Sequence, residues 1–315
     1  MAPYIRIAGV TRKFGDFVAV NEVSLEIQRG EIFCLLGGSG CGKTTLLRML
    51  AGFEEPTAGR IEIEDRGVEP LVLAREPDVL VLDLDRNVNQ QLTSWHLPEN
   101  EFTREHAVDL RGLLSHTAGL TVHGFPGYAV GEPRPTVPQI LDGEKPANTP
   151  AVRVNKVPGH GFRYSGGGTT IVQLLMVDTT KRDFTDLMRE LVLAPLGMSG
   201  STFAQPLPPE YESRATTAHD EQGQPVPGRW HIYPEQAPAG LWTTPSDMAR
   251  YIIEVQQAHE GKSNKVIGRP LIEQMLTPQG GGPVGLGPFL VERGNTRRFG
   301  HSGGNKGFRC DSLGF

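Results

Sequence analysis

Cysteine is scarce in this 315-residue sequence, which contains only Cys34, Cys41 and Cys310. Because the three are scattered and form no C-x-x-C pair, the sequence predicts neither a disulfide framework nor a cysteine-bound zinc site. Basic charge is not in excess either, since 31 Lys and Arg residues stand against 36 Asp and Glu residues. A chain with this charge balance is not expected to bind nucleic acid.

Long apolar runs are also missing. No stretch reaches the roughly 18 apolar residues that a membrane-spanning helix needs, so direct insertion into a membrane is not expected. The opening residues MAPYIRIAGV lack the charged start and the apolar core of a signal peptide. We therefore expect a cytoplasmic, soluble protein.

Two signatures of catalytic or metal sites are absent as well. None of the nine histidines belongs to an H-E-x-x-H motif or to an H-x-x-x-H pair, so no histidine metal site is predicted. No serine is followed three positions later by a lysine. The arrangement in which a lysine one helical turn away activates a serine nucleophile is therefore not present.

Apolar patterning predicts the elements of the chain. Alternating segments predict half-buried strands, and they are 4–9, 23–27 and 61–65. The nearly continuous apolar runs 32–36 and 79–83 predict buried strands of a parallel sheet. With a helix predicted over 44–51, this order of elements indicates an α/β architecture.

After about residue 84 the sequence becomes richer in proline and polar residues. Gly/Pro-rich stretches at 123–162 and 204–240 predict long loops. Helices are predicted between them and on either side, at 107–115, 168–180, 183–194, 245–260 and 269–276.

A glycine-rich loop follows the predicted strand 32–36. Residues Gly37 to Thr44 fit the pattern G-x-x-x-x-G-K-[ST], in which backbone N–H groups and a helix N-terminus surround phosphate oxygens. Lys43 is expected to reach the β and γ phosphates, and the Thr44 hydroxyl to bind Mg²⁺. A glycine-rich turn with a surface lysine is the alternative interpretation. The predicted nucleotide-binding residues of the loop are Gly37, Gly38, Ser39, Gly40, Cys41, Gly42, Lys43, Thr44 and Thr45.

The sequence around this loop, from VTRKFGDF to EEPTAGRI, resembles the opening of ABC transporter ATPases of the polyamine-import type. The resemblance implies that Phe14 stacks on adenine, although a core aromatic is the alternative interpretation. The segment EPDVLVLD (76–83) resembles the Walker B strand of that family, and Asp83 would then hold Mg²⁺ through water. The resemblance also implies ATP and Mg²⁺ as cofactors and a membrane permease as a partner.

Parts of that family's pattern are missing. Leu84 stands where the family has a catalytic glutamate after the Walker B aspartate. About 40 residues separate Lys43 from Asp83, which is too few for the family's Gln loop, helical subdomain and LSGGQ signature. The sequence therefore predicts nucleotide binding with weak or no hydrolysis.

From about Leu84 onward the motifs are of another kind. They are LDLDRNVNQQLTSWHLP, LRGLLSHTAGLT, FRYSGGG, APLGMSGSTF, AGLWTTPSDMARY and FGHSGGNKGF. In this order they resemble the serine hydrolases of the β-lactamase and penicillin-binding-protein superfamily, which includes esterase-like and peptidase-like members. The resemblance implies an α+β fold and hydrolysis of esters, β-lactams or peptides.

The same resemblance implies two catalytic residues. Tyr164, in Y-S-G, matches a loop tyrosine that assists proton transfer, and His301, in H-S-G, matches a strand motif on the opposite wall of the site. A loop tyrosine and a structural histidine are the alternative interpretations. Because the family's Ser-x-x-Lys pair has no counterpart here, we expect this site to be inactive.

Two other serines lie near histidine or tyrosine. Ser115 and His116 are adjacent, and adjacent residues on a helix point about 100° apart, so a dyad is not expected. Ser165 beside Tyr164 is expected to be a loop residue.

The sequence thus predicts a composite chain of two incomplete parts. Residues 1–83 are expected to form a partial α/β P-loop domain of ABC type, and residues 84–315 a partial α+β domain of β-lactamase type. Mg-ATP binding is the first functional hypothesis, because its residues are all present. A serine hydrolase that lacks its nucleophile is the second hypothesis, and a non-functional fusion product is the third.

Overall fold

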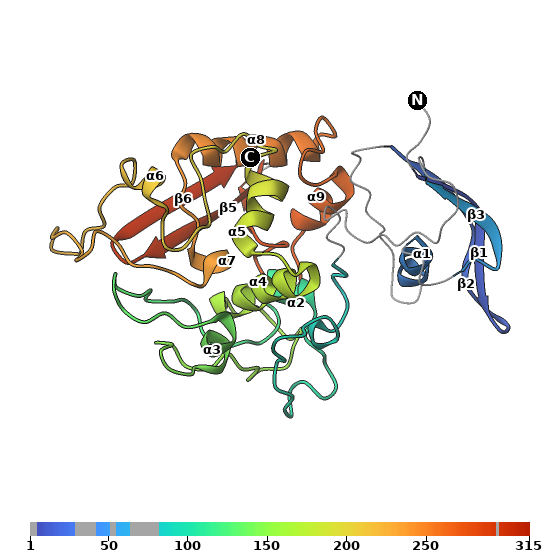
Figure 1. The fold of residues 1–315 in the computed structure, drawn as a ribbon, viewed down its shortest axis with the longest axis horizontal. Helices are drawn as coiled ribbons and strands as arrows, with labels where there is room; N and C mark the ends of the chain where they lie inside the picture. Colours follow the sequence, from blue (N-terminus) through green and yellow to red (C-terminus); the bar gives the residue numbers. More distant parts are fainter. Residues whose placement is uncertain (1–4, 29–41, 51–54, 64–81, 294–295) are drawn as a thin grey trace. The chain divides into compact units, whose positions relative to one another are not determined.

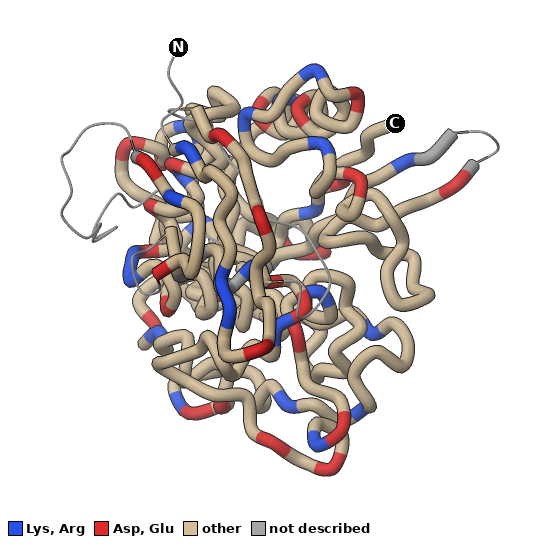
Figure 2. Tube along the Cα trace, turned by 90° about the vertical axis from the view of Figure 1, so that its right-hand side faces the viewer, with Lys and Arg blue, Asp and Glu red and all other residues tan. Residues whose placement is uncertain are grey.

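The computed structural model describes residues 5–28, 42–50, 55–63, 82–293 and 296–315. The chain divides into two compact units, residues 1–81 and 82–315, which are described separately (Figure 1). Lys and Arg are interspersed with Asp and Glu along the described trace (Figure 2). Among the described residues, no helix is both long enough and apolar enough to cross a membrane.

The first unit contains a three-stranded antiparallel sheet. Its strands are β1 (Ile5–Phe14), β2 (Phe17–Ile27) and β3 (Ala58–Ile63), in the order β2-β1-β3. Ile7 and Val10 of β1 are both buried although they are three residues apart, because the register shifts between them at Gly9, which has a φ of +58°. This irregularity breaks the apolar alternation that predicts a strand at 4–9, whereas β1 continues to Phe14.

The helix α1 (Lys43–Leu50) confirms the helix predicted at 44–51. Its apolar residues Leu46, Met49 and Leu50 form one cluster with Ile7, Val10 and Val20 of the sheet. Burial of each such side chain stabilises the fold by roughly 1.5–3 kcal/mol.

Gly42, directly before α1, lies against β2. It has a φ of +87°, and a Cβ at this position would lie 2.0 Å from the carbonyl oxygen of Ala19. The backbone conformation and the contact with Ala19 both require glycine.

Part of the predicted parallel sheet lies outside the described residues. The predicted strand 32–36 and residues 79–81 of the predicted strand 79–83 fall there. Leu82 and Asp83 are described, and they are not in a strand.

Up to Pro288 the named elements of the second unit are helices, joined by long loops. Its α-helices are α2 (Leu110–Leu114), α3 (Val137–Asp142), α4 (Gly166–Thr180), α5 (Phe184–Met188), α6 (Pro209–Glu212), α7 (Gln236–Ala239), α8 (Pro245–His259) and α9 (Arg269–Met275). The 3-10 helix η1 (Val88–Gln90) precedes α2, and the π-helical turn η2 (Arg189–Leu193) continues α5. All five helices predicted in this part are confirmed, with ends that differ by a few residues.

Several of these helices begin at a side chain that accepts a hydrogen bond from the first turn. The capping residues are Asp109, Thr136, Ser165, Asp183 and Thr244. A cap of this kind stabilises a helix by about 1 kcal/mol.

The start of α4 explains the sequence YSGGG. Gly166, Gly167 and Gly168 are buried, and a Cβ at Gly167 would lie 2.8 Å from a methyl carbon of Val152. Glycine is a poor helix former, but close packing requires it here. Ser165, which was expected in a loop, is the N-cap of this helix.

An antiparallel sheet follows the helices along the chain. It consists of β4 (Phe289–Arg293), β5 (Thr296–Asn305) and β6 (Phe308–Gly314), in the order β4-β5-β6. Phe299 of β5 and Leu290 of β4 belong to a buried cluster with Val255 of α8 and Ile272 of α9. The helices and this sheet confirm the α+β fold expected for this part.

Candidate active site

Tyr164 is held at the start of α4, directly before the capping residue. The Ser165 hydroxyl donates to the Thr121 carbonyl at 2.7 Å and accepts from the Gly168 N–H at 3.0 Å. The Ser165 N–H donates to His116 Nδ1 at 3.2 Å. These bonds fix the backbone beside Tyr164 and therefore the place from which its ring projects.

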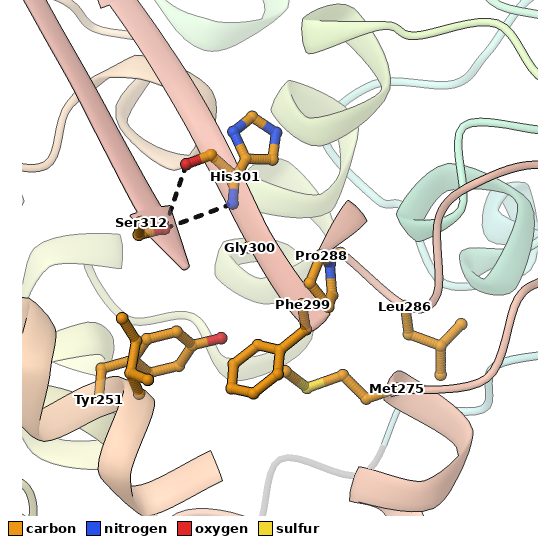
Figure 3. Close-up of a pocket in the computed structure, with 10 residues that line it drawn as sticks. Tyr251, Met275, Leu286, Pro288, Phe299, Gly300, His301 and Ser312 are labelled. Atoms are coloured by element: carbon orange, nitrogen blue, oxygen red, sulfur yellow. Dashed lines mark hydrogen bonds between the residues drawn. The ribbon is translucent and has the colours of Figure 1, made fainter. Parts of the chain in front are cut away.

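His301 lies on β5 opposite Ser312 of β6. The Ser312 hydroxyl accepts from the His301 N–H at 3.3 Å and donates to the His301 carbonyl at 3.1 Å (Figure 3). This pair of bonds reinforces the strand pairing at the histidine.

The structure brings Tyr164 and His301 together although they are 137 residues apart in sequence. The Tyr164 hydroxyl lies 3.3 Å from His301 Nε2. His301 Nδ1 lies 2.5 Å from the Ser302 carbonyl, which can only accept a hydrogen bond, so Nδ1 carries a proton. In the neutral ring Nε2 is then the acceptor, and Tyr164 donates to it.

Tyr164 is surrounded by rings. The His116 ring lies 4.2 Å and the His123 ring 4.8 Å from the Tyr164 ring, between centroids, and Phe289 stacks on it at 6.2 Å. Burial raises the pKa of the Tyr164 phenol, so the phenol keeps its proton near neutral pH. Burial, with smaller contributions from His301 and His123, lowers the pKa of His116 to about 4.

This environment gives the pair a defined chemistry. A neutral phenol donates a hydrogen bond, and the imidazole acceptor behind it can receive a proton. His116 is neutral near pH 7, because burial lowers its pKa to about 4, and it adds no positive charge that would favour a phenolate. Tyr164 is therefore suited to donate a proton or a hydrogen bond.

The neighbouring serines are engaged elsewhere. The Ser115 hydroxyl donates to the Arg111 carbonyl at 2.7 Å and lies 2.9 Å from the Thr117 hydroxyl. It makes no hydrogen bond with His116, as expected. The Ser165 hydroxyl caps α4. Neither serine is positioned as a nucleophile toward Tyr164 or His301.

The residues predicted to bind nucleotide are described only in part. Gly37, Gly38, Ser39, Gly40 and Cys41 lie outside the described residues. Gly42 directly precedes α1, Lys43 and Thr45 lie in its first turn, and of Thr44 only the backbone is described. The nucleotide site therefore remains a prediction.

The other two residues of the predicted nucleotide site are described. Phe14 lies at the end of β1 with its side chain 47% exposed, and the Arg12 guanidinium lies 4.6 Å from the centre of its ring. This exposure leaves a ring face available for stacking and does not fit a core aromatic. Asp83 belongs to the second unit, where its carboxylate accepts the Asp85 N–H at 3.0 Å. Among the described residues, no three His, Cys, Asp or Glu side chains group together as metal ligands.

Sequence reasoning did not single out Glu235 or Tyr251. Glu235 is fully buried, and Tyr251 lines a cavity between α8 and the sheet. Tyr251 ends the motif AGLWTTPSDMARY and Glu235 lies outside the quoted motifs, but for both residues it is tertiary packing that gives the unusual surroundings.

Curated relatives match the first part of the chain in short alignments. A spermidine/putrescine import ATP-binding protein of Rubrobacter xylanophilus is 44% identical over 109 residues, which are 32% of this chain and 29% of the relative. Its counterpart in Pseudomonas aeruginosa is 61% identical over 71 residues, which are 22% and 20% of the two chains. The chain thus spans less than a third of these relatives. The matches confirm the resemblance to polyamine-import ATPases and do not establish ATP binding.

Solved structures match about three quarters of the chain. A penicillin-binding protein from Bacillus halodurans has a TM-score of 0.55 at 18% identity, covering 74% of this chain and 69% of its own. A class C β-lactamase mutant has a TM-score of 0.51 at 17% identity, covering 74% and 67%. A D-amino acid amidase from Ochrobactrum anthropi has a TM-score of 0.51 at 22% identity, covering 71% and 63%. At these identities the likeness supports the fold alone.

The beta-lactamase family model matches residues 71–310. This range includes Tyr164 and His301. It begins before residue 84, where the sequence patterns placed the boundary between the two parts. Since the match covers well over half of the sequence, the chain belongs to the β-lactamase family.

Proposed function

We propose that the second unit binds ester, β-lactam or peptide carbonyl compounds beside Tyr164 and His301, and that it hydrolyses them weakly or not at all. The observation that carries this proposal is the 3.3 Å contact between the Tyr164 hydroxyl and His301 Nε2. Membership of the β-lactamase family supports the same class of ligand.

The two residues have different parts in this proposal. Tyr164, protonated near neutral pH, donates a hydrogen bond to an oxygen or nitrogen of the ligand. His301 Nε2 accepts the hydrogen bond of the phenol in the absence of ligand and offers an acceptor at the same edge of the site. The rings of Phe162 and Phe289, whose centroids are 6.0 Å apart, provide an apolar wall beside them.

Turnover is expected to be low because acyl transfer needs an activated nucleophile. The sequence has no Ser-x-x-Lys pair, and Ser115 and Ser165 donate their hydroxyl protons to backbone carbonyls. We therefore expect binding without a stable acyl-enzyme.

Fluorescence anisotropy with a fluorescent penicillin tests binding, and a chromogenic cephalosporin and a chromogenic ester test turnover. We expect saturable, reversible binding, no adduct by mass spectrometry, and hydrolysis close to the rate without protein. Tyr164→Phe removes one hydrogen bond and is expected to weaken binding about fivefold. Tyr211→Phe, at a distant tyrosine, is the matched control. Unchanged affinity in Tyr164→Phe would contradict the proposal.

Mg-ATP binding at residues 37–44 is a second candidate function. The observation that favours it is the 61% identity to an import ATP-binding protein over 71 residues, together with a helix that begins at Lys43. ATP and Mg²⁺ would be held by Lys43 and Thr44, with Phe14 on the adenine and Asp83 toward the metal. A membrane permease is the partner that this candidate implies.

Titration of a fluorescent ATP analogue with and without Mg²⁺ tests this candidate. Lys43→Ala is expected to weaken binding at least tenfold, because the ammonium group contacts the phosphates directly. Lys13→Ala, on β1, serves as the control for a general loss of positive charge. Equal affinity of the wild type and Lys43→Ala would exclude this candidate.

A further inference from the structure

A cavity of about 210 Å³ lies between α8, α9 and the sheet of the second unit. Its walls are mainly apolar, and they include Ile252 of α8, Met275 of α9, Leu286 before β4 and Phe299 of β5. A dry apolar cavity of about 150 Å³ is large enough to bind benzene. This cavity therefore has room for a single aromatic ring with a small substituent.

One polar side chain reaches into this apolar space without a hydrogen-bond partner among the described residues. Tyr251 of α8 lines the cavity, and its hydroxyl makes no hydrogen bond to any described residue. Figure 3 shows the hydroxyl directed toward the ring of Phe299. Burial raises the pKa of Tyr251, so the phenol is protonated and can donate.

The rest of the lining sets the charge of the ligand. None of the ten lining residues is Asp, Glu, Lys or Arg. An ion placed here would lose its hydration without gaining an opposite charge, so a charged ligand is disfavoured. Aromatic and sulfur-containing walls, from Phe299 and Met275, favour an aromatic ring.

We infer that this cavity is a binding site for a small uncharged aromatic compound that carries a hydrogen-bond acceptor, which the Tyr251 hydroxyl engages. The site goes beyond the proposed function. His301 lines the cavity, but Figure 3 shows the imidazole ring directed away from the ring of Phe299. The imidazole ring contacts Tyr164 instead. The two sites can therefore be tested separately.

Three probes of the same heavy-atom skeleton test the inference on the full chain. Acetophenone carries the ring and an acceptor, isopropylbenzene lacks the acceptor, and benzoate carries a charge. In NMR titrations we expect acetophenone to bind about fivefold more tightly than isopropylbenzene, which is the effect of one hydrogen bond. Benzoate is expected to bind at least tenfold more weakly than acetophenone.

Variants locate the binding. Tyr251→Phe is expected to bind acetophenone and isopropylbenzene equally, whereas Tyr211→Phe, outside the cavity, should keep the wild-type preference. Leu286→Trp fills the cavity and should abolish binding of both probes if it folds. The inference is overturned if neither uncharged probe binds the wild type, if the acetophenone preference survives in Tyr251→Phe, or if benzoate binds as tightly as acetophenone.

Discussion

Glu235 is completely buried at the start of α7, and neither of its carboxyl oxygens has a hydrogen-bond partner among the described residues. A charged carboxylate is strongly disfavoured in such a place, and burial raises the pKa of Glu235 from its ordinary 4.5 to about 7. Burial and the nearby Glu235 carboxyl also raise the pKa of Tyr128 to about 12. Both groups are therefore neutral in mildly acidic solution.

This pKa shift makes stability depend on pH. Below pH 4.5 Glu235 is protonated in the folded and unfolded states, and its contribution to stability is fully present. Between pH 4.5 and about 7 the unfolded state releases the proton first, so the free energy of unfolding falls by about 3 kcal/mol in total. Glu235→Gln should remove this loss. In urea unfolding it is expected to exceed the wild type in stability at about pH 8 and to match it near pH 4.5.

Glu254 provides the control for that experiment. It is also buried, but its carboxylate accepts hydrogen bonds from the Ser263 hydroxyl at 2.8 Å and the Lys265 N–H at 3.0 Å. Glu254→Gln is therefore expected to lower stability at about pH 8 rather than raise it. A difference between the wild type and Glu235→Gln that is the same at both pH values would contradict the role of ionisation.

The first turn of α4 depends on specific residues for its cap and its packing. Its cap Ser165 also holds the Thr121 carbonyl, and Gly167 lies against Val152. Ser165→Ala is expected to lower the free energy of unfolding by about 1 kcal/mol. Because Tyr164 directly precedes the cap, the variant should also weaken fluorescent penicillin binding.

Thr244→Ala, at the cap of α8, separates the two effects. It is expected to lower stability by a similar amount, about 1 kcal/mol, and to leave penicillin binding unchanged. Both quantities are measured by urea unfolding and fluorescence anisotropy. If both cap variants weaken binding equally, the effect of Ser165 is general destabilisation.

The helices show which elements sequence patterns predict and which they miss. Apolar periodicity predicted α2, α4, α5, α8 and α9, of which α4 and α8 are the longest. It missed α3, α6 and α7, which lie in the stretches 123–162 and 204–240 that were expected to be loops. Proline in these stretches suggested loops, but proline fits the first turn of a helix, and α3 and α6 place it there.

At the scale of the whole molecule, family motifs located the Tyr164–His301 pair, which the structure brings within 3.3 Å. They gave no role to Tyr251, although it ends the motif AGLWTTPSDMARY, or to Glu235, because the surroundings of both side chains follow from the packing of distant segments. The hydrolase hypothesis and the nucleotide-binding hypothesis differ in their support. Family membership supports the hydrolase-type site, whereas much of the phosphate loop lies outside the described residues.

Each unit has its own hydrophobic cluster, and we expect two unfolding transitions. Ile7 and Val10 belong to a cluster of the first unit, and Leu175 to a cluster of the second. Leu175→Ala should destabilise the second unit by about 2–5 kcal/mol and leave the transition of the first unit in place. Val10→Ala should do the reverse with a smaller effect. Circular dichroism in urea measures both, and one cooperative transition shifted by either variant would contradict independent unfolding.

The packing of Gly42 affects how this position can change in evolution. The contact with Ala19 and the positive φ require glycine whether or not a nucleotide is bound. If mutations elsewhere ended nucleotide binding, substitutions of Gly42 would still be selected against, because they would disturb the packing of α1 on the sheet. The second glycine of the motif can thus outlast the activity for which such motifs are selected.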